Sequence, residues 1–158
     1  MNLEQFYKEN YRIVYGYLYS LCGSKAWAED LTSETFLKAI SRIDSFDGRG
    51  KPSTWLCQIG KNVYLNERKR HNRHVPLDSV VIAEESTMEE KYIDKDLAER
   101  IRCLSKELDE TKQQLFTMRL NGMSFKDIGD ALGKTENWAR VTFFRVRNEI
   151  MDRLEGEA

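Results

Sequence analysis

The sequence predicts an all-α fold of two small helical domains joined by an acidic linker. Apolar residues recur at steps of three, four and seven in most segments, which is the spacing of one helix face, and no segment alternates convincingly at period two. With only 2 Pro and 9 Gly in 158 residues, the chain is poor in the turns that a β-sandwich needs. A hydrophobic content of 41% suffices for a packed core. No run of 18 apolar residues is present, so we expect a protein that is not inserted in a membrane.

Three helices are expected in the first domain. Ser24 can cap the second of them with its side-chain oxygen, and Ile40 and Ile43 belong to the stripe that this helix should bury. Pro52 suits the first position of the third helix, where a missing amide hydrogen costs little. Two glycines and three small polar residues predict a loop over 44–51. The expected helices cover residues 3–21, 25–43 and 52–70.

Residues 108–158 are expected to form the second domain. Asp109, Ser124 and Thr135 can each cap a helix. Gly133 stands where a tight turn between two helices needs a positive φ. The expected helices run from Asp109 to Asn121, from Phe125 to Leu132 and from Glu136 to about Leu154.

The two domains, residues 1–75 and 108–158, leave residues 76–107 as a linker. An acidic helix is expected near its end, over 88–104, with an apolar side. An extended tether that charge keeps soluble explains the same composition. The apolar side consists of Ile93, Leu97, Ile101 and Leu104.

Charge is segregated along the chain, although the net charge is only −1. Residues 1–47 carry a net −2, 48–76 a net +6, 77–110 a net −6 and 111–158 a net +1. Attraction to phosphate is local, because salt screens it beyond about 10 Å at 0.1 M. The basic segment is therefore a candidate nucleic-acid surface.

Residues 124–147 have the pattern of a helix-turn-helix. Ile128, Ala131 and Leu132 are expected to face inward from the first helix. From the second helix the expected inward set is Ala139, Val141, Phe143 and Val146. Polar residues remain for solvent or for DNA bases and phosphates, and a plain helical hairpin with a solvated basic face is the alternative. These polar residues are Asn137, Arg140, Thr142, Arg145 and Arg147.

Between Phe46 and Arg73, aromatic residues alternate with cations. Bases stack on aromatic rings while cations neutralise the backbone, so the pattern suits single-stranded nucleic acid. The alternative is that Trp55 and Tyr64 are core aromatics and the terminal cations a solvated helix end. Trp55 is expected to anchor its helix rather than to wedge against a duplex.

Cysteine and histidine give no sign of a catalytic or metal site. Cys22, Cys57 and Cys103 are odd in number and widely spaced, which is typical of free thiols in a reducing cytoplasm. Cys57 with His71 and His74 matches no common zinc spacing. No nucleophile–base pair or Gly-rich phosphate loop accompanies the two histidines. We therefore expect a protein that is not an enzyme and needs no cofactor.

Three motifs in this order resemble bacterial sigma factors of the extracytoplasmic-function (ECF) class of the sigma-70 family. The segment AEDLTSETF at 28–36 is similar to the segment that binds core RNA polymerase. STWLCQIGKN at 53–62 is similar to the promoter-opening segment. GMSFKDIG at 122–129, continuing through Arg147, is similar to the C-terminal helix-turn-helix.

The resemblance implies three groups of site residues. The second helix would dock on the β′ coiled coil of the polymerase, and the loop and third helix would hold an unpaired base of the −10 element. The last helix would read the −35 element as duplex. The implied core-binding residues are Asp30, Leu31, Thr32, Glu34 and Thr35. The implied −10 residues are Phe46, Gly48, Arg49, Trp55, Lys61 and Asn62. The implied −35 residues are Asn137, Arg140, Phe144, Arg145 and Arg147.

The resemblance also implies partners and a cellular place. The implied partners are core RNA polymerase, through its β′ coiled coil and β flap, promoter DNA and an anti-sigma factor. The implied location is the cytoplasm. The acidic linker would thread through the polymerase channel. A stand-alone helix-turn-helix regulator is the alternative function, and it would need neither the 28–36 nor the 53–62 motif.

Overall fold

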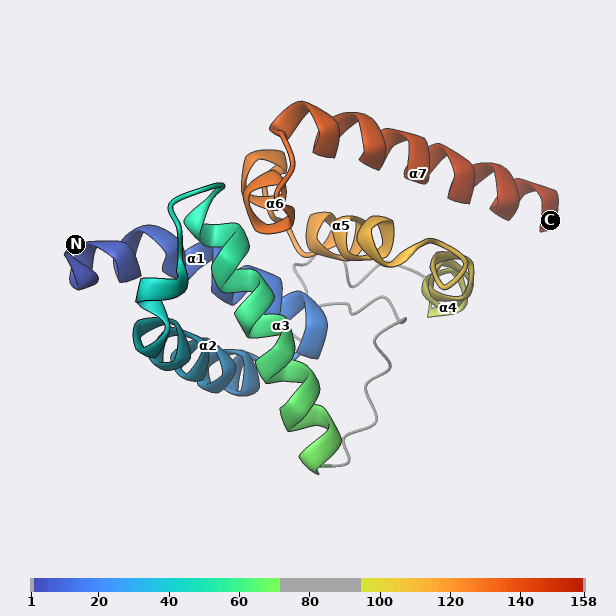
Figure 1. The fold of residues 1–158 in the computed structure, drawn as a ribbon. Helices are drawn as coiled ribbons and strands as arrows, with labels where there is room; N and C mark the ends of the chain where they lie inside the picture. The colour runs from blue at the N-terminus through green and yellow to red at the C-terminus, as the bar shows by residue number, and fades with distance from the viewer. Residues whose placement is uncertain (1, 72–94, 158) are drawn as a thin grey trace.

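The computed structural model describes residues 2–71 and 95–157, and every regular element in these two stretches is helical (Figure 1). The all-α prediction is confirmed. No helix in the described stretches is both long and apolar enough to cross a bilayer. The elements are α1 (Leu3–Cys22), α2 (Lys25–Ser41), the 3₁₀ turn η1 (Ile43–Ser45), α3 (Pro52–His71), α4 (Lys95–Ser105), α5 (Glu110–Leu120), α6 (Phe125–Leu132) and α7 (Glu136–Glu157).

Helices α1, α2 and α3 pack against one another as a three-helix unit, which we call the N-terminal unit. Val14, Leu18, Leu56 and Val63 lie at 0–1% exposure in its core. Capping fixes the α1–α2 corner: Gly23 adopts φ 73°, and the Ser24 hydroxyl accepts a hydrogen bond from the Trp27 amide. The predicted Ser24 cap is therefore confirmed.

The second helix is shorter than predicted. It ends at Ser41, and Ile43 falls in the 3₁₀ turn that follows. Ile40 is 45% exposed, so the expectation that it belongs to the buried stripe is wrong. The reason is its place in the last turn of α2, where the side chain faces outward instead of into the three-helix core.

Helices α5, α6 and α7, together with α4, form the C-terminal unit. Leu104 of α4 lies in one apolar cluster with Phe116, Val146 and Ile150 of α5 and α7. Helix α4 is therefore part of a packed unit rather than of a free tether. Of its predicted apolar side, Leu97 is 37% exposed and Ile93 lies outside the described residues.

The two units are in contact with each other, which the sequence did not predict. Helices α5 and α6 pack on α1, and α6 also packs on α3. In Figure 1, α6 lies beside the amino-terminal end of α3, while α7 extends away from the N-terminal unit. Leu115, Met118 and Ile128 of the C-terminal unit belong to the same apolar cluster as Leu18 and Leu21 of α1.

Candidate functional site

The helix-turn-helix motif is formed by α6 and α7. Ser124 caps α6 by accepting a hydrogen bond from the Asp127 amide at 3.1 Å. Gly133 ends α6 at φ 72°, and the Thr135 hydroxyl accepts from the Trp138 amide at 3.0 Å to cap α7. Gly129 allows the turn to approach α6, because a Cβ there would lie only 2.8 Å from the Lys134 carbonyl oxygen.

Four of the five predicted −35 residues share one exposed face of α7. Asn137, Arg140, Phe144 and Arg147 follow at steps of three, four and three, and all are exposed. The Arg147 guanidinium lies 5.6 Å from the centroid of the Phe144 ring. The face thus offers two guanidinium groups, an amide and an aromatic ring, although Arg140 also forms a 3.0 Å ion pair with Glu136 and Phe144 packs near Phe125.

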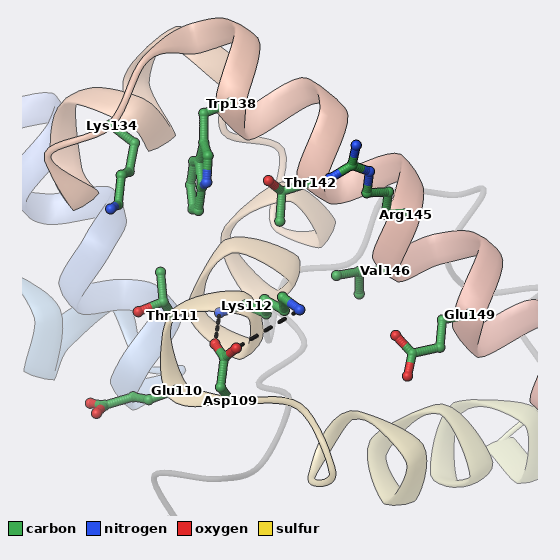
Figure 2. Close-up of a pocket in the computed structure, with 10 residues that line it drawn as sticks. All are labelled: Asp109, Glu110, Thr111, Lys112, Lys134, Trp138, Thr142, Arg145, Val146 and Glu149. Atoms are coloured by element: carbon green, nitrogen blue, oxygen red, sulfur yellow. Dashed lines mark hydrogen bonds and ion pairs between the residues drawn. The ribbon is translucent and has the colours of Figure 1, made fainter.

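Arg145 lies on a different face of α7. It follows Phe144 by one residue, which is about 100° around the helix. Figure 2 shows it on the wall of a groove of about 610 Å³ between α7 and the start of α5, with Lys112 and Glu149 as other lining residues. Because this groove carries both signs of charge, it has no clear preference for phosphate. The structure therefore does not bring Arg145 together with the other four.

Two other side chains of α7 differ from the expectation. Thr142 is only 8% exposed and contributes to the wall of the same groove, although it was expected to face solvent or ligand. Val141, expected inward, is 38% exposed. The cause is that α5 and α4 pack on α7 as well as α6, so the buried stripe of α7 is turned toward Thr142, Val146 and Ile150.

The predicted −10 residues of the loop and of early α3 form a pocket. Phe46, Arg49 and Trp55 line a cavity of about 510 Å³. The Phe46 and Trp55 rings are 5.1 Å apart at a tilt of 31°. Gly48 keeps the loop turned at φ 79°. Trp55 is half-buried and packs on the main core, so it anchors α3 as expected and also forms a wall of the pocket.

Lys61 and Asn62 lie farther along α3 and do not line this pocket. Asn62 is exposed and shares a helix face with Trp55 and Gln58, which precede it by seven and four residues. Lys61 makes an ion pair with Glu110 at the start of α5. The predicted −10 residues therefore extend from the loop before α3 along this helix, and Glu110 of the C-terminal unit forms an ion pair with one of their cations, Lys61.

Three of the five predicted core-binding residues are buried within the N-terminal unit. Leu31, Thr32 and Thr35 are 1%, 0% and 0% exposed, so a partner cannot touch them while α2 stays packed. The two threonine hydroxyls donate to the carbonyl oxygens of Ala28 and Leu31. Their role in this structure is to hold α2 in the bundle, which corrects the expectation that they face a partner.

The outward face of α2 carries Asp30, Glu34 and Leu37. Asp30 is exposed, Glu34 forms a 3.8 Å ion pair with Lys38, and Leu37 is 69% exposed. Sequence reasoning missed Leu37. Its steps of seven from Asp30 and three from Glu34 were the signal that could have placed it on their face.

Cysteine burial differs among the three thiols. Cys22 and Cys57 are buried and Cys103 is exposed. Burial raises the pKa of the Cys57 thiol. Of the zinc ligands considered in the sequence, the His71 side chain and His74 lie outside the described residues. Within those residues, no group of three His, Cys, Asp or Glu side chains could hold a metal ion.

Comparison with known proteins finds similarity to RNA polymerase sigma factors. Residues 6–74 match the family described as sigma-70 region 2. The ECF RNA polymerase sigma factor BldN of Streptomyces coelicolor is 29% identical over 155 residues, and the match covers 92% of this chain but 57% of BldN. The ECF RNA polymerase sigma factor SigM of Bacillus subtilis is 24% identical, and the match covers 95% of this chain and 93% of SigM.

A solved structure supports the fold. The sigma factor RpoE, in its co-crystal structure with the anti-sigma factor NepR from Bartonella quintana, superposes with a TM-score of 0.52. The match covers 96% of each chain at 21% sequence identity. Two small helical domains in one chain are therefore an arrangement that this chain shares with a known protein.

Proposed function

We propose that this chain is a sigma factor of the ECF class of the sigma-70 family, which binds core RNA polymerase and directs it to promoters. Its role is recognition and DNA melting, with no catalysis and no cofactor of its own. The single observation that carries the proposal is that one chain holds two surfaces of different kinds, each with the chemistry that suits nucleic acid. One is the aromatic pocket at the start of α3, and the other is the helix-turn-helix face of α7.

The N-terminal unit reads the −10 element as a separated strand. A base removed from the duplex loses a few kcal/mol of stacking and pairing, and the Phe46 and Trp55 rings offer a replacement surface. Arg49 at the pocket wall and Lys61 farther along α3 neutralise phosphates. Asn62 both donates and accepts hydrogen bonds and so can recognise a base edge.

The C-terminal unit reads the −35 element as duplex. A helix of this kind fits the major groove, where arginine can donate two hydrogen bonds to guanine. We assign base and phosphate contacts to Asn137, Arg140, Phe144 and Arg147. Arg145 is assigned to the neighbouring groove instead, because it faces away from these four.

Core polymerase binds the outward face of α2 through Asp30, Glu34 and Leu37. An acidic face with an exposed leucine is complementary to a partner helix with basic and apolar groups. The family implies the β′ coiled coil as that partner and the β flap as the partner of the C-terminal unit. The same family background implies an anti-sigma factor that covers these faces and a cytoplasmic site of action.

The two functional regions are residues 1–75 and 108–158, and residues 76–107 join them. Packing of α4 on α7 adds the end of that linker to the second region structurally. The net −6 of residues 77–110 suits a segment that passes through a channel built for nucleic acid.

Run-off transcription with purified core polymerase tests the proposal. Genomic fragments from upstream regions serve as templates, and transcript starts are mapped with and without the protein. Starts that require both core enzyme and this protein support it. Specific duplex binding in the absence of core, together with no effect on initiation, would favour a stand-alone regulator and reject the proposal.

A further inference from the structure

Phe125, the first residue of α6, lies at the centre of an aromatic cluster that joins α5, α6 and α7. Its ring centroid is 5.8 Å from that of Phe143 and 6.2 Å from that of Phe144. Phe143 in turn stacks at 5.9 Å on Phe116, which is 5% exposed. The cluster therefore runs from the core of the C-terminal unit to its surface, where Phe125 is half-buried.

Two arginines from different helices lie against the Phe125 ring. The Arg119 guanidinium of α5 is 4.1 Å from the ring centroid, and its Nη1 also donates a hydrogen bond to the Met123 carbonyl oxygen at 2.9 Å. The Arg140 guanidinium of α7 is 5.6 Å from the same centroid. Both distances are within the range of about 6 Å over which a cation is attracted to an aromatic face. Arg119 thus fixes the ring at the turn between α5 and α6, and the ring contacts Arg140 across the helix-turn-helix.

Arg140 is held in two ways that differ in what they leave free. Its Nη2 donates to the Glu136 carboxylate at 3.0 Å, which engages a donor that guanine or phosphate would need. The contact with Phe125 uses none of the five N–H donors of the guanidinium. Phosphates repel the Glu136 carboxylate when DNA approaches, whereas a neutral ring is not repelled. The ring contact is therefore the one that can persist in the complex.

The same cluster supports the second arginine of the −35 face. The Arg147 guanidinium lies 5.6 Å from the centroid of the Phe144 ring, and that ring contacts both Phe125 and Phe143. Aromatic side chains rotate about only two χ angles, so rings packed between three helices have little freedom. One connected set of rings thus carries both flexible guanidinium groups of this face.

We propose that Phe125 is a positioning residue for −35 recognition, whose ring orients the Arg140 guanidinium toward the major groove before DNA binds. The inference rests on the proposed function. Ordering a long side chain on binding lowers the affinity by about two- to tenfold, and a side chain that is already held avoids this loss. Phe125 therefore acts through Arg140 and not through a contact of its own with a base.

Phe125→Leu tests the proposal, because it removes the ring and keeps an apolar side chain. Binding of the holoenzyme is measured on promoters whose transcript starts have been mapped and on versions with single base-pair changes in the −35 element. We expect Phe125→Leu to reduce discrimination by about two- to tenfold at the base pair that Arg140→Ala also affects, and to leave the other base pairs unchanged. Phe125→Tyr keeps the ring and should restore discrimination.

A double-mutant cycle separates positioning from folding. In the Arg140→Ala background, Phe125→Leu should have no further effect on discrimination. Phe116→Leu is the matched control, because Phe116 lies at the buried end of the same cluster; it should lower Tm and leave discrimination as in the parent. Equal loss of affinity for every duplex in Phe125→Leu, or an effect that simply adds to that of Arg140→Ala, would overturn the inference.

A measurement on the free protein distinguishes this inference from the proposed function. In nitrogen-15-labelled protein, the Nε–H signal of Arg140 is assigned by its loss in Arg140→Ala. We expect this signal to carry a ring-current shift and restricted motion in the parent and in Phe125→Tyr, and to lose both in Phe125→Leu. An unchanged signal in Phe125→Leu would overturn the inference. If the unmodified chain fails to start transcription with core polymerase, the proposed function is rejected, while this measurement still decides whether Phe125 holds Arg140.

Discussion

Gly129 in α6 is the position where a single added methyl group should damage the helix-turn-helix most. In Gly129→Ala the new Cβ would lie 2.8 Å from the Lys134 carbonyl oxygen, and 2.9 and 3.0 Å from the carbonyl oxygen and carbon of Thr135. All three are backbone atoms of the turn between α6 and α7, so no side-chain rotation can relieve the clash. The turn must move away from α6 instead.

The expected loss in the free energy of unfolding is the difference between two opposing effects of the added methyl group. Overpacking of this kind costs about 1–3 kcal/mol, and backbone contacts place Gly129 at the upper end. Alanine is favoured over glycine in a helix by about 1 kcal/mol. The net loss is therefore about 2 kcal/mol, or a fall of about 4–8 °C in Tm for a chain of this size.

Gly156→Ala provides the matched control, because no atom lies within 4 Å of a Cβ at this helical glycine. Circular dichroism should show an unchanged or slightly higher Tm for Gly156→Ala and a lower one for Gly129→Ala. The Gly129 variant should also bind −35 duplex more weakly, since the turn sets the angle of α7. A Gly129→Ala protein that melts with or above the parent would refute the close approach of turn and helix.

Three further predictions concern the proposed site and the thiols. Arg140→Ala should weaken holoenzyme binding to a −35 duplex by about 1–3 kcal/mol, about 5- to 150-fold, if the contact to guanine is two-pronged, and an unchanged dissociation constant would exclude Arg140 from recognition. Asn62→Ala should reduce promoter melting in permanganate footprinting, whereas Asn66→Ala, exposed one turn farther along α3, should not; equal melting in the two would contradict the assignment. Iodoacetamide at pH 8 should modify exposed Cys103 well before Cys57, whose burial raises the pKa of its thiol, and mass spectrometry showing equal modification would contradict the packing of α3.

Local signals predicted the secondary structure well. The bounds of α6 coincide with prediction because Ser124 and Gly133 mark both of its ends with side-chain and backbone chemistry. The end of α2 was misjudged because no such residue stands there; Arg42 provides only backbone hydrogen bonds. For α6, the cap residues therefore allowed the sequence to determine both helix ends.

The buried and exposed faces of a helix were harder to predict than the position of the helix in the sequence. Leu31 and Thr35 belong to the apolar stripe of α2 by spacing, yet the family motif also made them candidates for contact with a partner. Burial decides between these two readings and leaves Asp30 and Leu37 as the outward residues. A motif thus identifies a helix that takes part in a function without saying which of its side chains touch the partner.

The packing of one unit on the other could not be predicted from the sequence. Arg12 and Asp127 are 115 residues apart, and each resembles an ordinary solvated charge on a helix. Nothing in the local pattern distinguishes them from Lys8 and Glu4, which pair within one turn of α1. Long-range complementarity becomes visible only when the helices are placed in space.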